Sequence, residues 1–577
     1  MKIRLPVMIQ DQTVAEGKGT ELAEMVTVEE SFFLDGPVSE RVAVLDFDES
    51  GRLAPLLRFK PASSATKMGF YVGAGNRSVD IHSSAFIQAS VMGSVLRTMQ
   101  MFEEKDTLGR KVKWAFDGPQ LLIVPRAGEW ENAFYERDSH SLQLFSFKSQ
   151  RKEYEHLGAD RPVIHTCLSH DVISHETAHA ILDGIAPDLY HALLPQSLAL
   201  HEAIADLTAL IMAFRSKDLR KTVLDQTDGL IDESTAFSSI AEEFGVGRQR
   251  LGPLRPLRSL LNDRKMKNRT KRRISPHELS EVLSGALYTV MVRMHESRKR
   301  RYGKGSKSLF SVSGKALWDA AQHFKRMILR ALDYLPPGEV SFADYGRAIL
   351  AADAASHPNS GVERDWIAEE FVRREIVDDV RHLQLDPTLE SAVAGLNDAL
   401  KEIDLSTLVS SDWAAYDFAN KNRDLLQIPA GRPFEVRPRL EVTKTSWYGK
   451  KDERPHSECL FKVSWEIDED NPALRGLPSK RLITVGTTLV IDRATGAVRA
   501  LLTSDANPEL EKERNAMITH LAEEGRLAIG SAAIGPDGNP LRSVVQAEQS
   551  GDLLRIQNSA RMLHIEGLDL EEEANHA

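Results

Sequence analysis

The stretch DVISHETAHAILDG, residues 171–184, contains the motif that decides how this chain is interpreted: H-E-x-x-H, with His175 and His179 at its ends. Its pattern predicts a helix that Asp171 can cap at the start. On a helix the i and i+4 spacing puts both imidazoles on one face, about one turn apart, so that both can bind one ion. Glu176 then lies beside that ion, where a carboxylate can take a proton from water whose pKa zinc has lowered. The alternative is a pair of solvent-facing histidines on an amphipathic helix.

A second segment, SLALHEAIADLTALIMAF at residues 197–214, supplies a candidate third ligand. Catalytic zinc usually has three protein ligands and one open position. On a helix Glu202 and Asp206 share a face, so Glu202 can ligate while Asp206 accepts the outer N–H of a ligand histidine and fixes its tautomer. A solvated acidic face is the alternative. The leucines and isoleucines around these carboxylates favour burial, however, and a buried carboxylate needs a partner.

At these residues the chain resembles the thermolysin family of zinc peptidases, which are gluzincins. Tyr190 follows His179 at the interval where the family has a tyrosine that hydrogen-bonds the tetrahedral intermediate. The resemblance implies one zinc ion per chain, held by His175, His179 and Glu202, with Glu176 as the general base. It also implies that Tyr190 stabilises the charge developing on the carbonyl oxygen, although a tyrosine in a connecting loop is common.

Three more segments resemble parts of the family's site. Asn132 and Ala133, in N-A-F-Y, resemble the edge strand that pairs with an extended substrate backbone. Arg258, in P-L-R-S, resembles the arginine that contacts a substrate carbonyl. His277, in S-P-H, takes the place of a second donor to the oxyanion and so joins the predicted catalytic residues. The alternatives are a strand entering a hairpin and a surface histidine at the start of a helix.

The resemblance covers roughly residues 65–376 and fails in three places. Family members are typically secreted with a signal and a long propeptide, and this chain shows neither. Their calcium cluster is incomplete here, so calcium is not expected, and Asp171 is assigned to helix capping. The acid that should orient His277 is replaced by a basic run at residues 267–273. Such runs are usually solvated loops, but they can also select acidic stretches of a protein partner.

The bulk composition limits the remaining classes of function. The 577 residues are too many for one core and predict roughly two to four domains. A net charge of -11 leaves no basic excess to neutralise phosphates, so nucleic acid is not an expected partner. Cys167 and Cys459 lie far apart, which does not suggest a disulfide scaffold. No run of about 18 apolar residues and no signal peptide are seen, so we expect no membrane partner and a cytoplasmic location.

Strand patterns dominate near the N-terminus, helical patterns follow, and strand patterns return after about residue 433. We expect an α+β chain: a two-lobed zincin catalytic unit with the metal in the cleft between its lobes, followed by a separate α+β domain. The expected boundaries are 1–160 for a β-rich N-terminal lobe with the substrate edge strand, 161–380 for a helical zinc-binding lobe, 381–430 for a connector, and 431–577 for a C-terminal α+β domain of unknown role.

The sequence therefore predicts a zinc-dependent endopeptidase whose substrate is a protein or peptide. Endopeptidase is favoured over aminopeptidase because the edge-strand motif suits a chain that runs through the cleft, and no element that would hold a free amine is seen. The alternative is a zinc-binding, specialised or regulatory protein whose proteolysis is gated, confined to one target or autoproteolytic, with the C-terminal domain recognising a partner. A structural zinc site is disfavoured, because Glu176 and the open fourth position would have no use in it.

Overall fold

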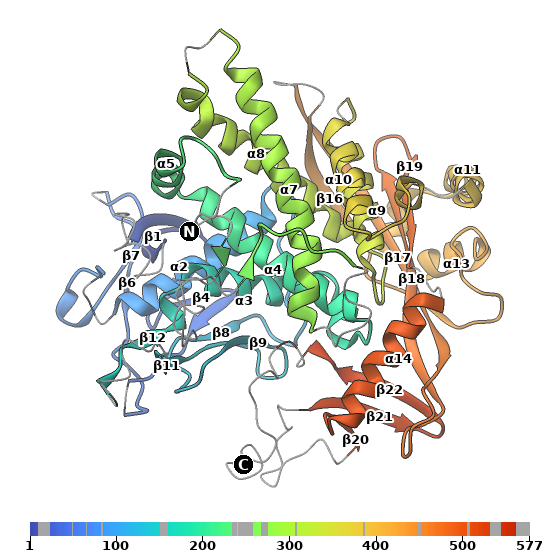
Figure 1. The fold of residues 1–577 in the computed structure, drawn as a ribbon, viewed down its shortest axis with the longest axis horizontal. Helices are drawn as coiled ribbons and strands as arrows, with labels where there is room; N and C mark the ends of the chain where they lie inside the picture. The colour runs from blue at the N-terminus through green and yellow to red at the C-terminus, as the bar shows by residue number, and fades with distance from the viewer. Residues whose placement is uncertain are drawn as a thin grey trace.

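The computed structural model shows a chain with mixed α and β structure, in which a central group of helices lies between N-terminal and C-terminal sheets (Figure 1). The helices include α3, α4 and α7, and the C-terminal sheet is the orange region of the figure. The structure describes residues 1–9, 23–48, 50–64, 66–81, 83, 85–149, 158, 160–232, 239–240, 258–266, 275–305, 308–359, 361–384, 387–447, 452–504, 508–530, 544–560 and 563.

The N-terminal part consists of short strands packed on one long helix. The alternating side chains Ile3, Leu5 and Val7 of β1 are fully buried, and β1 packs against α2. The largest sheet has the strand order β3-β4-β5-β8-β10-β9, so β9 lies at its edge. The elements are β1 (Lys2–Met8), β2 (Ala23–Glu29), β3 (Phe33–Leu34), β4 (Val38–Ser39), β5 (Val42–Val44), β6 (Arg58–Lys60), β7 (Phe70–Val72), η1 (Ala74–Asn76), α2 (Phe86–Glu103), β8 (Leu121–Val124), β9 (Ala133–Glu136), β10 (Ser141–Leu144), β11 (Ser146–Lys148), β12 (Val163–His165) and η3 (Thr166–Leu168).

The central helices are organised around α4, which packs against both α3 and α7. Among the described residues, α4 is the one helix that is long and apolar enough to cross a membrane, and its apolar stretch is entirely buried inside the protein. The elements are α3 (His170–Ile185), η4 (Pro187–His191), α4 (Pro195–Arg215), α5 (Lys217–Gln226), β13 (Ser239–Ile240), β14 (Arg258–Ser259), α7 (Pro276–Tyr302), α8 (Phe310–Arg330), η6 (Ala331–Tyr334), α9 (Phe342–Ser356), α10 (Val362–Arg373) and η7 (Val380–Leu383).

The start of α3 differs from the sequence-based expectation. Ser169 is the N-cap, and its Oγ accepts a hydrogen bond from the Val172 N–H at 3.4 Å. Asp171 is not the cap; it lies in the first turn, where a negative charge suits the positive end of the helix dipole. Near the other end, Gly184 permits a close approach, because a Cβ there would lie 2.0 Å from the Lys113 carbonyl oxygen.

The C-terminal sheet has an apolar core on each face. Along β17, Phe461 and Val463 belong to a core shared with α11, α12 and α13, whereas Leu460 belongs to the core shared with the central helices. This division follows from the alternation of side chains along a strand. Residues 381–430, expected to be a connector, thus supply the helices α11, α12 and α13 to the core that contains Phe461 and Val463.

The strand order of this sheet is β15-β17-β18-β22-β21-β20, with β16 paired to β17 and β19 paired to β18. The elements are α11 (Pro387–Lys401), α12 (Leu405–Ser410), α13 (Asp412–Lys421), β15 (Phe434–Val436), β16 (Leu440–Trp447), β17 (Glu453–Asp470), β18 (Lys480–Asp492), β19 (Val498–Thr503), α14 (Pro508–Glu523), β20 (Leu527–Ile529), β21 (Val545–Ser550) and β22 (Leu553–Asn558).

A buried ion network joins this sheet to the central helices. Asp333, in η6, accepts hydrogen bonds from Arg110 at 2.6 Å and from Lys444 of β16 at 2.7 Å. Arg330, at the end of α8, donates to Glu458 of β17 at 2.7 Å. Burial alone would raise the pKa of Asp333, but Arg110 and Lys444 outweigh it and lower the pKa to about 2. The C-terminal domain is therefore attached by charge as well as by apolar packing.

Candidate metal centre

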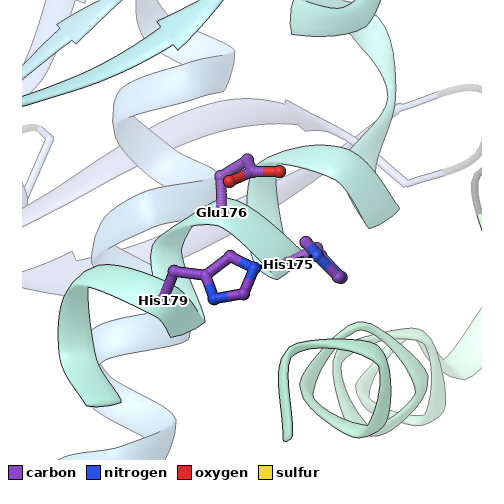
Figure 2. A group of neighbouring side chains, drawn as sticks. All are labelled: His175, Glu176 and His179. Carbon is purple, nitrogen blue, oxygen red and sulfur yellow. Dashed lines mark hydrogen bonds between the residues drawn. The ribbon is translucent and has the colours of Figure 1, made fainter. Parts of the chain in front are cut away.

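Helices α3 and α4 bring three candidate ligand side chains to one point. The Nε2 atoms of His175 and His179 lie 3.1 Å apart. Glu202 of α4 places Oε2 3.5 Å from His175 Nε2 and Oε1 3.3 Å from His179 Nε2. All three residues are buried. Figure 2 shows the two imidazoles next to each other on α3, with the carboxylate of Glu176 above them.

These separations fit a tetrahedral zinc site. Zinc bonds to nitrogen and oxygen are about 2.0–2.2 Å long, so the edges of the tetrahedron are about 3.3–3.6 Å. The observed separations of 3.1, 3.3 and 3.5 Å are close to this edge length. Two histidines and one glutamate leave one position open, which is the pattern of catalytic zinc sites. The residues present therefore fit one zinc ion.

The outer nitrogen of each imidazole meets a polar side chain of α4. Asp206 Oδ1 lies 3.0 Å from His175 Nδ1, and His201 Nδ1 lies 3.1 Å from His179 Nδ1. Such contacts fix the tautomer and the ring orientation of metal ligands. Sequence reasoning named Asp206 but missed His201. The available signal was its position next to Glu202 in a helix that is otherwise mostly apolar.

Glu176 is held by the edge strand of the N-terminal sheet. The Tyr135 N–H of β9 donates to Glu176 Oε2 at 3.1 Å. A ligand atom of Glu176 lies within 4.8 Å of those of His175 and His179. Burial, the largest influence, raises the pKa of Glu176 above its usual value even though the imidazoles act in the opposite direction. A carboxylate in this setting is suited to accept and return a proton.

Tyr190 lies in η4, directly after α3, and is buried. The Arg137 N–H, just after β9, donates to Tyr190 Oη at 3.2 Å, and the Arg137 guanidinium carbon lies 4.1 Å from the centre of the tyrosine ring. Arg137 pairs with Asp183 of α3, which also accepts from the Tyr135 hydroxyl at 2.8 Å. Burial raises the pKa of Tyr190 above its usual range, so its hydroxyl stays protonated and can donate.

His277 also lies at this site. It is in the first turn of α7, with Nε2 3.3 Å from Glu202 Oε2 and 24% of its side chain exposed. The structure thus brings His277 against the carboxylate of a candidate ligand. In that position it can stabilise the charge of Glu202, and its predicted contact with an oxyanion stays a prediction.

The predicted substrate-binding residues are less completely placed. Asn132 Oδ1 accepts a hydrogen bond from the Ala133 N–H at 2.9 Å, so in this structure that N–H is already bonded to the side chain of the preceding residue. Arg258 lies in β14, opposite Ile240 of β13. Its neighbours at 256–257 and the basic run at 267–273 lie outside the described residues.

A second cluster, formed by His323, Asp353 and His357, is also compact enough to hold an ion, but its hydrogen bonds favour a different interpretation. Asp353 Oδ1 lies 3.2 Å from His323 Nε2 and 2.9 Å from His357 Nδ1. Arg298, which can only donate, lies 2.8 Å from His323 Nδ1. That nitrogen therefore accepts, and the proton sits on Nε2, where a metal would need a lone pair. Arg364 also donates to Asp353 at 2.8 Å, so the cluster is a network that joins helices.

No protein-family model matches this chain, and the search of curated proteins finds no match. The resemblance to the thermolysin family therefore stays a prediction, and the functional argument depends on the geometry of the site.

Proposed function

We propose that this protein is a zinc-dependent endopeptidase. The observation that carries the proposal is the pair of oriented imidazoles. His175 and His179 turn their Nε2 atoms toward each other and toward Glu202, while their Nδ1 atoms meet Asp206 and His201. An imidazole that donates from Nδ1 has its lone pair on Nε2, which is the form that binds zinc.

The proposed arrangement is that of a two-lobed zincin, with the N-terminal sheet and the central helices meeting at the metal. The main-chain N–H groups of Tyr135 and Arg137 reach Glu176 and Tyr190, respectively. Both therefore point away from β10, along the outer edge of β9, because alternate residues of a strand direct their main-chain groups to the same side. An extended polypeptide that lies along this edge would pass both side chains.

The chemistry we propose is hydrolysis of a peptide bond. A zinc ion at this site supplies a Lewis acid, which polarises a carbonyl and lowers the pKa of water. Glu176 takes the proton of the attacking water and delivers it to the leaving nitrogen. Tyr190 donates a hydrogen bond to the oxygen on which negative charge develops. Burial of both groups strengthens these interactions, because little bulk water screens them.

An endopeptidase is favoured because a substrate lying along the edge strand β9 can continue on both sides of the scissile bond. One observation favours a second candidate, a peptidase that is specialised for one target or gated by a partner. The C-terminal domain reaches the turn of Tyr190, where the Ser559 N–H donates to the Tyr190 carbonyl oxygen at 3.1 Å. A domain in that position can limit which substrates reach the site.

The test is hydrolysis of unfolded casein and of quenched fluorescent peptides by the full chain and by Glu176→Gln. We expect the wild type to cleave internal bonds and Glu176→Gln to lose about 10²- to 10⁴-fold in rate while keeping its zinc. Glu370→Gln, at a buried glutamate of α10, is the matched control and should keep the activity. Zinc without casein cleavage would favour the specialised candidate, whereas full activity in Glu176→Gln would contradict the mechanism.

A further inference from the structure

The turn that carries Tyr190 borders a large cavity. The cavity has a volume of about 910 Å³ and lies between η4 and the C-terminal sheet. Asp188 and His191 of the turn line one side, and residues of β15, β17, β18 and β22 line the other. Leu189 and Tyr190 of the turn pack into the apolar core, but the contacts that cross the cavity to Asp188 and to the Tyr190 carbonyl oxygen are hydrogen bonds.

Some of the hydrogen bonds to the turn come from outside the C-terminal domain: the Gly338 N–H donates to Asp188 Oδ2 at 3.0 Å, and Arg137 donates to the Pro187 carbonyl oxygen at 3.0 Å. The others come from the C-terminal domain. Arg437, just after β15, donates to Asp188 Oδ1 at 3.0 Å, and its Nε donates to Ser464 Oγ at 2.9 Å, which orients the guanidinium. Ser559, just after β22, donates to the Tyr190 carbonyl oxygen twice, from its N–H at 3.1 Å and from its hydroxyl at 3.2 Å. The side chain of Asp188, two residues before Tyr190, and the main chain of Tyr190 itself are thus both held from across the cavity.

Strand β22 also holds the segment at Arg137 and Asp138, which contacts the hydroxyl of Tyr190. Asn558, the last residue of β22, donates from Nδ2 to Asp138 Oδ2 at 3.1 Å. Asp138 follows Arg137, whose N–H donates to Tyr190 Oη. The end of β22 therefore fixes both the carbonyl end of Tyr190 and the loop that meets its hydroxyl.

We propose that Arg437 and Ser559 are positioning residues, through which the C-terminal domain completes the catalytic site by fixing the turn of Tyr190. This inference rests on the proposed function, in which Tyr190 stabilises an oxyanion. A donor of this kind is effective because it is already in place when charge develops, and a displacement of about 1 Å can cost about 10²-fold in rate. The domain is then a required part of the enzyme, and removing its contacts lowers activity.

The first test compares Arg437→Ala and Ser559→Ala with Arg439→Ala in the full chain. Arg439 is the matched control, because it lies two residues further on but donates to the Val409 carbonyl oxygen at 3.1 Å, away from η4. We expect kcat to fall about tenfold in Arg437→Ala and less in Ser559→Ala, with KM and zinc content unchanged. Arg437→Lys should recover part of the loss, and Arg439→Ala should keep the wild-type kcat.

A double-mutant cycle shows whether Arg437 acts through the tyrosine. If it does, Arg437→Ala should lower kcat in the wild type but have no further effect in a Tyr190→Phe background. Losses that multiply in the double variant would mean that Arg437 acts by another route and would overturn the inference.

Hydrogen exchange of residues 186–193, followed by mass spectrometry, tests the same contacts without any activity. We expect faster exchange in Arg437→Ala and Ser559→Ala and no change in Arg439→Ala. If the wild type shows no peptidase activity, the proposed function fails, and this measurement still tests whether the domain fixes the turn. If kcat and exchange are both unchanged in both variants, the inference is overturned while the peptidase proposal stands.

Discussion

His201 of α4 lies with its Nδ1 3.1 Å from the Nδ1 of His179 on α3, and the two buried rings stack with their centres 5.3 Å apart. Burial lowers the pKa of His201 well below its usual value, so its ring is neutral. A neutral His201 can accept the Nδ1 proton of His179, which leaves the lone pair of His179 on Nε2, the atom that faces the metal position. His201 thus orients a ligand without touching the metal.

We predict that His201→Ala lowers the affinity for zinc by about 10- to 100-fold, the usual effect of losing a group that orients a metal ligand. The measurement is competition for zinc against a chromophoric chelator. His295→Ala is the control, because His295 is also buried but contacts Ser313 of α8. Equal zinc affinity in wild type and His201→Ala would show that the contact between His201 and His179 does not orient His179 for zinc binding.

Tyr190→Phe removes only the hydroxyl that we assign to the oxyanion. We predict that kcat falls by about 10²- to 10³-fold, because one preorganised donor is lost, while KM and zinc content stay close to those of the wild type. Steady-state kinetics on one fluorescent peptide measures both constants. Tyr345→Phe is the matched control, since its buried hydroxyl donates to the Ile328 carbonyl oxygen. A wild-type kcat in Tyr190→Phe would remove this residue from the mechanism.

The lowered pKa of Asp333 predicts how the stability of the folded protein depends on pH. Its folded pKa of about 2 is below the ordinary value of 3.8. The stabilisation of the folded protein by ionised Asp333 is therefore fully present above about pH 4 and is lost as the pH falls through about 2. At neutral pH it amounts to about 2 kcal/mol, from 1.36 kcal/mol per pKa unit.

We test this with urea unfolding of wild type and Asp333→Asn at several pH values. The difference in unfolding free energy between the two proteins should be constant above about pH 5 and shrink toward pH 2, because protonation makes Asp333 neutral first in the unfolded and then in the folded state. Groups that titrate elsewhere change both proteins alike. A difference that does not change with pH would show that the ion network with Arg110 and Lys444 does not hold Asp333 ionised.

The proposed ligands could be predicted from sequence because their positions depend on local spacing. His175 and His179 share a face of any helix that contains them, and Glu202 and Asp206 do the same on the next helix. The role of His201 could not be predicted in this way. It depends on how α3 and α4 pack, which places an additional side chain of α4 against the outer nitrogen of His179.

The C-terminal part shows a second limit on what can be predicted from sequence. The sequence ECLFKVSWEI predicts a strand at 458–467, within the observed β17, but a strand pattern does not state what covers each face of the sheet. The structure shows helices of the supposed connector on one face and the central helices on the other. The contacts of Arg437 and Ser559 with the turn of Tyr190 span long separations in sequence, and no local pattern encodes them.

The central claim, one zinc ion held by His175, His179 and Glu202, is tested most directly by elemental analysis of the purified full chain and of Glu202→Ala. Asp353→Asn serves as the control at the second histidine cluster. We predict one zinc per chain in the wild type and in Asp353→Asn, and loss of zinc in folded Glu202→Ala. No zinc in the wild type, or zinc that is kept in Glu202→Ala and lost in Asp353→Asn, would contradict the account.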